Sequence, residues 1–283
     1  MQIREALKEA SKKLYKSSTP DLDARLLLST ATASTYEQLL LNYYKELPVD
    51  LENFFFMLVA RRESMEPVAY ITGKQEFYSL DFIVNNNVLI PRPDTELLVD
   101  ILINDCNRRS GGKDITILEL GVGSGAISIS LATHIATSKI IALDISNDAL
   151  EVARTNAQIH NVQEQVNFIK SDWYTSLGTE KYDYIVSNPP YISQREKGQI
   201  AKETYLFEPD LALYASDDGL NAYKSIIASA HRHLKSHGKL ILEIGYLQKE
   251  ALINIFKEYT FTELDIKQDL SRYDRVIIAK QCV

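Results

Sequence analysis

Residues 115–125 read Ile-Thr-Ile-Leu-Glu-Leu-Gly-Val-Gly-Ser-Gly, a short apolar run that passes directly into a loop with three glycines. The run Ile115–Leu120 is rich in isoleucine and leucine, which favours a buried strand. Glycines after a strand permit a tight turn and let a ligand approach bare backbone at the carboxyl edge of a sheet. The stretch therefore predicts a strand, a ligand-binding turn and the start of a helix.

The rest of the C-terminal part alternates β-branched runs with helical stretches, which is typical of a parallel sheet covered by helices on both faces. A helix over Thr95–Arg108 is expected before the first strand. The predicted strands are Ile115–Leu120, Lys139–Asp144, Val166–Lys170, Tyr182–Ser187, Lys239–Ile244, Phe261–Ile266 and Arg275–Ala279. We therefore expect an α/β fold with one seven-stranded, Rossmann-like sheet.

The N-terminal part predicts a small helical domain. Apolar residues recur at helical spacing in Ile3–Leu14. Thr19-Pro20-Asp21 combines a cap residue, a first-turn proline and an acidic residue, and Ser34-x-x-Glu37 has the spacing of a capping box. A later helix carries Phe54–Val59, which we assign to the core of the bundle, with a groove for a partner as the alternative.

A β-hairpin is expected between the two parts. Extended residues in Phe77–Val84, the turn Asn85-Asn86-Asn87 and the run Val88–Ile90 indicate two strands joined by a turn. The sequence therefore divides into a helical domain, a hairpin connector and an α/β domain. Their ranges are 1–75, 76–93 and 94–283.

Composition narrows the expected partners and location. Lys and Arg number 31 against 38 Asp and Glu, and the net charge of −7 disfavours direct nucleic acid binding. The longest apolar run, Phe54–Ala60, is too short to span a membrane, and the charged start is unlike a signal peptide. Cys106 and Cys282 form no metal-binding pair or disulfide framework, which fits a reducing cytoplasm. We expect a cytoplasmic monomer.

Histidines near the C-terminus give only a weak metal signal. His231, His233 and His237 cluster on a helix expected to end at Gly238, but no further ligand is apparent. Cationic side chains in a last helical turn favour the helix dipole, so we expect a capped helix and no metal. The pair Asp217-Asp218 is expected to start the helix before them.

Asp144 closes the second predicted strand, about twenty residues beyond the glycines, where a carboxylate can accept hydrogen bonds from both ribose hydroxyls of an adenosine cofactor. The glycine run followed by Ala126 also fits a loose dinucleotide pattern. The glycines alone therefore do not separate a nicotinamide cofactor from S-adenosylmethionine. A purely structural role for Asp144 near the next helix start remains the alternative.

Ser187-Asn188-Pro189-Pro190-Tyr191 follows the fourth predicted strand at the same edge of the sheet. Two adjacent prolines cannot continue a strand or open a helix freely, so they stiffen this loop. Because prolines lack N–H groups, the carbonyl oxygens of Asn188 and Pro189 are left to accept from a planar NH2 group, with the flat face of Tyr191 beside it. The segment predicts a receptor for an amide or amine, with a stiff turn as the alternative.

Methyl transfer to an amide would depend on positioning. An amide nitrogen is a poor nucleophile because its lone pair is delocalised, as the rotation barrier of ~18–20 kcal/mol shows. Two hydrogen bonds of about 0.5–1.5 kcal/mol each cannot offset that. Orienting the nitrogen toward a sulfonium methyl can contribute roughly 7–11 kcal/mol. Carbonyl acceptors also favour the positive charge that develops on nitrogen, so no nucleophilic side chain or metal is needed.

The amide receptor and the glycine loop together resemble the amino-methyltransferases that use S-adenosylmethionine. More closely, the chain is similar to the peptide chain release factor glutamine N5-methyltransferases of the HemK type. The supporting stretches are Arg61-Arg62, Glu66-Pro67-Val68-Ala69-Tyr70-Ile71-x-Gly73, Leu89-Ile90-Pro91-Arg92-Pro93-Asp94-Thr95-Glu96, Asp172-Trp173, Phe207-Glu208-Pro209 and Glu243-Ile244-Gly245. Glu119 and Val122 depart from the usual Asp and Thr of the glycine motif, and glutamate is commoner at Asp94.

The resemblance implies methylation of the glutamine in the Gly-Gly-Gln motif of release factors, with S-adenosylhomocysteine as the second product. It implies a helical domain that docks this protein substrate. The implied cofactor-binding residues are Glu119, Gly121, Val122, Gly123, Ser124, Gly125, Asp144, Asp172, Trp173 and Asn188. The glutamine would lie against Asn188, Pro189, Pro190 and Tyr191, and the first, second and last of these are the expected catalytic residues. Arg92 is a further candidate for substrate binding, with a plain surface arginine as the alternative.

Other functions remain as alternatives. A ribosomal protein glutamine methyltransferase would use the same site. An adenine N6-methyltransferase on DNA or RNA shares the Asn-Pro-Pro-Tyr logic, but the net charge of −7 offers little phosphate anchorage. A nicotinamide-dependent reductase would leave residues 188–191 unexplained. A binding module without catalysis would be distinguished by asking whether the purified chain binds S-adenosylmethionine.

Overall fold

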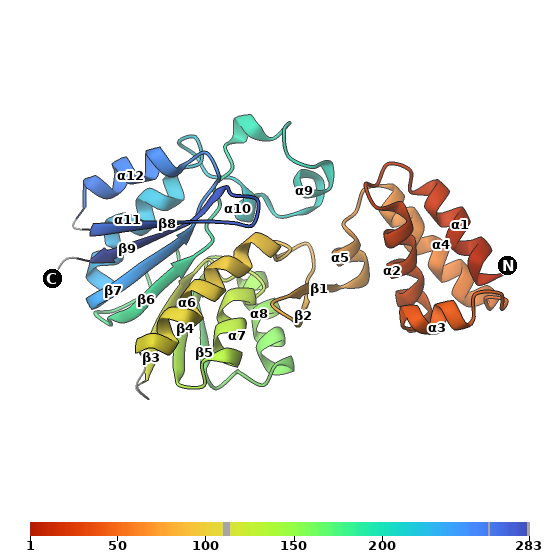
Figure 1. The fold of residues 1–283 in the computed structure, drawn as a ribbon, viewed down its shortest axis with the longest axis horizontal. Coiled ribbons are helices and arrows are strands. Elements are labelled where there is room, and N and C mark those ends of the chain that lie inside the picture. Colours follow the sequence, from red (N-terminus) through yellow and green to blue (C-terminus); the bar gives the residue numbers. More distant parts are fainter. Residues whose placement is uncertain (110–113, 260, 282–283) are drawn as a thin grey trace. The chain divides into compact units, whose positions relative to one another are not determined.

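The computed structural model describes residues 1–109, 114–259 and 261–281, and it divides the chain into two compact units. The first unit comprises Met1–Lys74 and Ile200–Phe207, and the second comprises Gln75–Gln199 and Glu208–Val283. Figure 1 shows the elements of each unit. The return of residues 200–207 to the first unit differs from the sequence-based division, which left them in the α/β domain.

Short helices packed around one apolar core make up the first unit. They are α1 (Ile3–Lys13), α2 (Pro20–Thr32), α3 (Tyr36–Leu41), α4 (Val49–Glu63) and α5 (Val68–Thr72). The later helix α9 (Lys202–Phe207) also belongs to this unit but has no buried residue. The core includes Leu27, Phe55 and Leu58, all with less than 3% of their surface exposed. Phe54 and Met57 are exposed, because the helical period turns only one side of α4 inward. The run Phe54–Val59 therefore contributes to the core through one face only: Phe55, Leu58 and Val59 are buried as expected, whereas Phe54 and Met57 are not.

The predicted capping box of α3 is displaced by one residue. Thr35, not Ser34, caps the helix: its Oγ1 accepts from Gln38 N (3.4 Å), and Gln38 Oε1 accepts from Thr35 N (2.9 Å). Ala33 ends α2 in the left-handed conformation, and Ser34 N donates back to Ser29 O. Ser34 therefore belongs to the end of the preceding helix and is not available to start the next.

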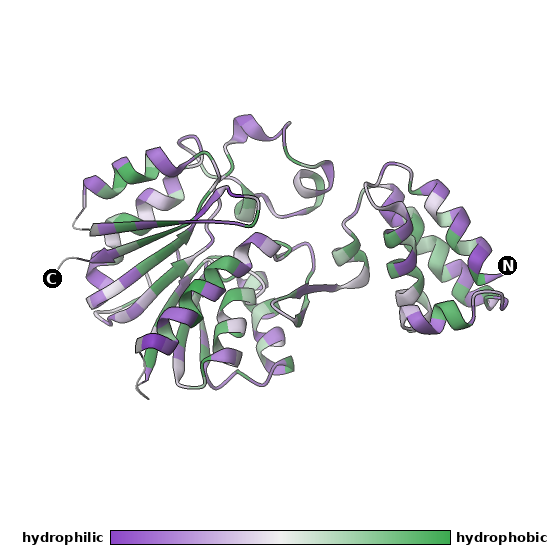
Figure 2. Cartoon of the chain, in the orientation of Figure 1, coloured by the Kyte–Doolittle hydropathy of each residue, from purple (hydrophilic) through white to green (hydrophobic). Residues whose placement is uncertain are grey.

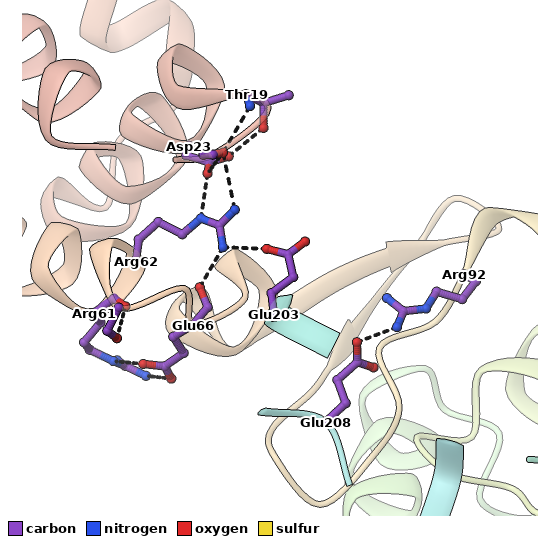
Figure 3. A network of polar contacts seen from close by, with 10 residues as sticks. Thr19, Asp23, Arg61, Arg62, Glu66, Arg92, Glu203 and Glu208 are labelled. Atoms are coloured by element: carbon purple, nitrogen blue, oxygen red, sulfur yellow. Dashed lines mark hydrogen bonds and ion pairs between the residues drawn. The ribbon is translucent and has the colours of Figure 1, made fainter. Parts of the chain in front are cut away.

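A buried arginine ties α9 to the first unit (Figure 3). Arg62 Nε donates to Asp23 Oδ2 (2.7 Å), and Arg62 Nη1 donates to Glu203 Oε2 (2.6 Å). The Arg62 side chain is 7% exposed and the Glu203 side chain is 37% exposed. Because Glu203 lies 141 positions from Arg62, no local sequence pattern could place these segments in one unit.

A two-stranded hairpin begins the second unit, but its turn is earlier than predicted. β1 (Lys74–Phe77) pairs with β2 (Leu80–Ile83), and Tyr78 and Ser79 form the turn with φ of +53° and +59°. Carboxylates stabilise this turn: Tyr78 N donates to Glu96 Oε1 (2.8 Å) and Ser79 N to Glu76 Oε1 (2.6 Å). A turn is present at Asn85–Asn87, where Val88 N donates to Asn85 O (3.2 Å), but the run Val88–Ile90 forms no strand, so the prediction that this turn joins a hairpin was wrong.

The main sheet confirms the expected α/β fold. Its strands are β3 (Ile115–Leu120), β4 (Ser138–Asp144), β5 (Val166–Lys170), β6 (Tyr182–Ser187), β7 (Leu234–Glu243), β8 (Phe261–Gln268) and β9 (Asp274–Gln281). Their order is β5-β4-β3-β6-β7-β9-β8. The first five of these are mutually parallel, and β9 is antiparallel to both of its neighbours.

Helices cover both faces of this sheet (Figure 1). They are α6 (Glu96–Arg109), α7 (Ala126–His134), α8 (Asn147–Ile159), α11 (Asn221–His233) and α12 (Lys249–Lys257). The short helix α10 (Asp210–Leu213) and the 3-10 turns η1 (Pro93–Thr95) and η2 (Gln194–Glu196) complete the second unit. Figure 2 shows hydrophobic and hydrophilic residues side by side along most helices, as expected for helices that bury one side. α7 is the exception, because residues 126–132 are all buried. The central strands are buried on both faces, so their carboxyl ends are held rigidly.

The structure corrects the expectations for the histidine and aspartate clusters. α11 ends at His233, and His237 lies on β7 with a φ of +63°. His233 and His237 therefore do not share a helix face. Asp217 and Asp218 form a turn with positive φ before α11 and do not begin it. Cys106 is buried, whereas Cys282 lies outside the described residues. Within the described ranges, no helix has the length and apolar character required to cross a membrane.

Candidate active site

The carboxyl ends of β3, β4 and β6 open onto a cavity of about 330 Å3. β3 lies between the other two strands: the chain continues from β3 to β4 and β5 on one side and then crosses to β6 on the other. Doubly wound sheets bind ligands at the point where the strand order reverses in this way. Ser187 Oγ donates to Leu120 O (2.6 Å), which ties the end of β6 to the end of β3. The predicted site residues that line the cavity are Arg92, Glu119, Gly121, Val122, Gly123, Ser124, Asp144, Asp172, Trp173, Asn188 and Pro190. Gly125, Pro189 and Tyr191 are not part of the lining.

The glycine loop adopts a backbone that favours glycine. Gly121, Gly123 and Gly125 have φ of +75°, +54° and +85°. A Cβ at Gly121 or Gly123 would meet nothing within 4 Å, so the backbone there borders open space. A Cβ at Gly125 would lie 2.7 Å from Ile129 Cδ1, so this glycine permits close helix packing. The loop therefore offers two bare peptide units to a ligand.

Asp144 supports the glycine loop from the end of β4. Its Oδ2 accepts from Gly123 N and its Oδ1 from Ser146 N, both at 2.9 Å. Burial raises the pKa of Asp144, while these backbone donors act in the opposite direction. Each carboxylate oxygen can accept a second hydrogen bond, so the side chain can still receive two hydroxyl donors.

Glu119 is a buried carboxyl group at the same rim. Its Oε2 accepts from Ser128 N (3.0 Å) and from the Ser128 hydroxyl. Burial, with a smaller contribution from the charge of Asp144, raises the pKa of Glu119 to about 8. At neutral pH Glu119 is therefore mostly protonated in the free protein and can donate as well as accept a hydrogen bond.

The segment 188–191 forms the opposite rim. The half-buried Asn188 donates from Nδ2 to Thr95 Oγ1 (3.1 Å). Tyr191 O accepts from Gln248 Nε2 (3.0 Å), and the Tyr191 ring packs against the hydrophobic core. Burial raises the pKa of Tyr191 above its ordinary value, so its hydroxyl stays protonated. Within this rim, Asn188 and Pro190 border the cavity and Tyr191 supports the loop from the core side.

Arg92 is held by a buried carboxylate (Figure 3). Its Nη2 donates to Glu208 Oε1, and Glu208 Oε2 accepts from Ile90 N (3.1 Å). The side chain of Arg92 is 36% exposed and that of Glu208 is 1% exposed. The pair fixes Arg92 at the cavity rim.

Sequence reasoning assigned no role to several residues that complete the site. Thr95 lines the cavity and donates from Oγ1 to Glu243 Oε2 (2.6 Å). Glu208 anchors Arg92, and Asn86–Leu89 add to the lining. The signal for Thr95, Glu208 and Glu243 was their presence in the stretches that carried the family resemblance, without any local pattern that explained them.

The sheet order, the glycine loop and the cavity define a Rossmann-like methyltransferase. Residues 93–208 match the family described as methyltransferase small domain. A crystal structure described as a methyltransferase from Pyrococcus furiosus shares the fold, with a TM-score of 0.54 and 16% sequence identity over 81% of this chain and 98% of that chain. This likeness concerns the fold alone.

The N-terminal helices and a relative of full length together show the family. Residues 5–73 match the PrmC N-terminal domain. Over 282 residues the chain is 37% identical to the release factor glutamine methyltransferase of Buchnera aphidicola subsp. Baizongia pistaciae, with 99% of this chain and 100% of that protein covered. The chain belongs to the release factor glutamine methyltransferase family, which confirms the resemblance seen in its motifs.

A second group of relatives is longer. Over 292 residues the chain is 44% identical to a bifunctional methyltransferase of Rickettsia typhi, and it covers 56% of that protein. The chain thus spans about half the length of these bifunctional relatives.

Proposed function

We propose that this protein transfers a methyl group from S-adenosylmethionine to the side-chain amide nitrogen (N5) of the glutamine in the Gly-Gly-Gln motif of peptide chain release factors. The observation that carries the proposal is the Asn188 carboxamide at the cavity rim, directly after β6 and in front of two prolines. The proposal is supported by full-length similarity to a release factor glutamine methyltransferase.

The residues of the glycine-loop rim fit the proposed cofactor. S-adenosylmethionine, when bound, supplies the sulfonium methyl group. The bare backbone at Gly121 and Gly123 leaves open space for it, and Asp144 and Glu119 offer oxygens for ribose hydroxyls. We propose that Val122, Ser124, Asp172, Trp173 and Asn188 complete this binding surface, with Gly125 shaping the loop from behind.

Asn188 and Pro189 would orient the substrate. The Asn188 side-chain oxygen and the Pro189 carbonyl are the acceptors proposed for the two N–H bonds of the glutamine amide, with Pro190 and Tyr191 fixing the loop. Because positioning can lower the reaction barrier by roughly 7–11 kcal/mol, a rigid receptor suits this weak nucleophile. The same oxygens favour the positive charge that develops on nitrogen. Arg92 would contact the polypeptide around the glutamine.

The proposed partner is a release factor protein. The first unit would dock it, as the match to the PrmC N-terminal domain supports. The net charge of −7 argues against direct nucleic acid binding. We propose that the enzyme acts as a monomer in the cytoplasm, where translation termination takes place, without a metal and without a membrane partner.

The test is methylation of defined acceptors. The purified chain is incubated with labelled S-adenosylmethionine and, in separate reactions, a release factor, its Gly-Gly-Glu variant, ribosomal proteins and DNA. We expect label only in the intact release factor, and peptide mapping should place it on the Gly-Gly-Gln glutamine. Label in ribosomal protein or adenine, with none in the release factor, would overturn the proposal.

A further inference from the structure

A hydrogen-bonded chain of three side chains runs from the cavity into the protein core. Asn188 Nδ2 donates to Thr95 Oγ1 (3.1 Å), and Thr95 Oγ1 donates to Glu243 Oε2 (2.6 Å). The three residues come from the end of β6, the turn η1 and the end of β7. Thr95 is 4% exposed and Glu243 is 1% exposed, so water does not compete for these bonds.

While Glu243 is ionised, the hydrogen-bond donors and acceptors of these three side chains have only one consistent arrangement. An ionised carboxylate only accepts hydrogen bonds, so the single proton of the Thr95 hydroxyl is committed to Glu243. Thr95 Oγ1 can then only accept from Asn188. The group of Asn188 that faces Thr95 must therefore be its NH2, because a carbonyl oxygen in that position would find no donor.

We infer that Glu243 is a positioning residue which, through Thr95, fixes the orientation of the Asn188 carboxamide so that its oxygen is presented to the substrate. The inference rests on the proposed function, in which this oxygen accepts an N–H bond of the glutamine amide. If the carboxamide rotated by half a turn, its NH2 would face the NH2 of the substrate. That arrangement would lose a hydrogen bond and leave buried donors unpaired.

The surroundings of Glu243 suit a carboxylate that holds one fixed hydrogen bond. Tyr223 donates its hydroxyl to Glu243 O (3.0 Å), which fixes the backbone at this point. The charges of Arg275 and Arg92 favour the ionised form, whereas Asp94 opposes it. Arg275 is itself held by Asp269 (3.0 Å) and Asp94 (3.2 Å). Burial raises the pKa of Glu243 to about 7, so the carboxylate dominates at mildly alkaline pH.

Two conservative variants would interrupt the series of hydrogen bonds from Asn188 to Glu243 at separate points. Thr95→Val keeps the shape of the side chain and removes the hydroxyl, and Glu243→Gln keeps the shape and can present either an oxygen or an NH2 to Thr95. Each should lower kcat for release factor methylation by about 10- to 100-fold, assayed at pH 8. The affinity for S-adenosylhomocysteine, measured by calorimetry, should change less than about threefold. Thr95→Ser retains the hydroxyl and should restore most of kcat.

The sheet itself supplies a matched control. Thr116 Oγ1 donates to Asp183 Oδ2 (2.8 Å) at the opposite end of β3 and β6, so it reproduces a threonine–carboxylate bond away from the cavity. Thr116→Val should lose some stability and keep wild-type kcat. Equal losses of kcat in Thr116→Val and Thr95→Val would show a general structural effect and overturn the inference.

A second readout separates this inference from the proposed function. In protein labelled with 15N-asparagine, the side-chain NH2 signal of Asn188, assigned by its loss in Asn188→Ser, should shift and exchange faster with water in Thr95→Val and Glu243→Gln. An unchanged signal, or wild-type kcat in Thr95→Val, would overturn the positioning role while leaving methylation intact. If the wild-type protein failed to methylate release factors, the proposed function would fall, and the Asn188 signal would still decide whether the chain of hydrogen bonds holds the carboxamide.

Discussion

The two rims of the cavity are built in different ways. On the rim formed by the glycine loop and Asp144, called here the glycine rim, Glu119 contacts Ser128 and Asp144 contacts Gly123 and Ser146, so each partner lies within 21 positions along the sequence. On the rim formed by residues 188–191, called here the amide rim, Asn188 is held by Thr95, 93 positions away, and Thr95 by Glu243, 148 positions away. The glycine rim is thus a local structure, whereas the amide rim exists only once the whole sheet has assembled.

The largest expected effect lies on the amide rim. Asn188→Ala should lower kcat by about 100- to 1,000-fold, the loss typical of removing one preorganised polar group from a transition state. The substitution removes a half-buried side chain from the end of β6 and leaves the strand pairing unchanged, so the folded structure should persist. Single-turnover assays and circular dichroism would check both points. Turnover at the wild-type rate would contradict the receptor assignment.

The next effect lies on the glycine rim and concerns binding. Asp144→Asn leaves one oxygen where Gly123 N and Ser146 N both need an acceptor, and it removes the charge offered to a ribose. We expect about 10- to 100-fold weaker cofactor binding, with kcat at saturating cofactor nearly unchanged. Calorimetry with S-adenosylhomocysteine would measure this. The control for lost charge is Asp148→Asn, at an exposed position in the first turn of α8, which follows Asp144 in the sequence. This variant should bind the cofactor normally.

The pH dependence of stability tests the burial of Glu119. Its pKa is about 8 in the folded protein and about 4.5 when unfolded, so its contribution to stability is fully present below pH 4.5 and is lost as pH rises through 8. In the free protein, Glu119→Gln should remove this contribution. The wild type should therefore lose stability relative to the variant between pH 6 and 8, by at most about 1.4 kcal/mol per pH unit. Thermal melts of both proteins would show this, and parallel curves would argue against a protonated Glu119.

The smallest effect separates two glycines of one loop. Gly125→Ala places a Cβ 2.7 Å from Ile129 Cδ1 at a φ of +85°, whereas Gly121→Ala meets only backbone strain at a φ of +75°. Both should lose about 1–2 kcal/mol of stability from the left-handed backbone, and Gly125→Ala should lose more. Only Gly121→Ala should fill space meant for the cofactor and weaken its binding. Equal cofactor affinity in the two variants would contradict this difference.

Local chemistry explains what the sequence predicted well. β3 and β6 match their predicted bounds, because buried parallel strands read as continuous apolar runs. β5 also matches, although it is an edge strand in which only Val166 is buried. β7 begins at Leu234, five positions before the predicted Lys239, since its polar first half is held by pairing of Leu234 with Tyr182. The turn at Tyr78 and Ser79 depends on Glu96, which lies on another element. Such long-range partners carry no local signal.

The same limit applies to the site. The glycine loop, Asp144 and the segment 188–191 were found because each has its own motif, and the structure brings most of these residues to one cavity. Thr95, Glu208 and Glu243 matter through their partners in the folded protein. A threonine after Pro-Asp or a glutamate at a strand end has no chemical signature until the partner is known.

The path of residues 200–207 has a practical consequence. The chain leaves the segment 188–191, contributes α9 to the helical unit through Arg62 and Glu203, and re-enters the second unit at Glu208. A fragment ending at Lys74 would therefore lack one partner of a buried guanidinium, and exchange of helical units between relatives requires transplanting two separate stretches. Variation in the helical unit is for this reason expected to be inherited together with the chain that follows residues 188–191, so that these two separate stretches evolve in step.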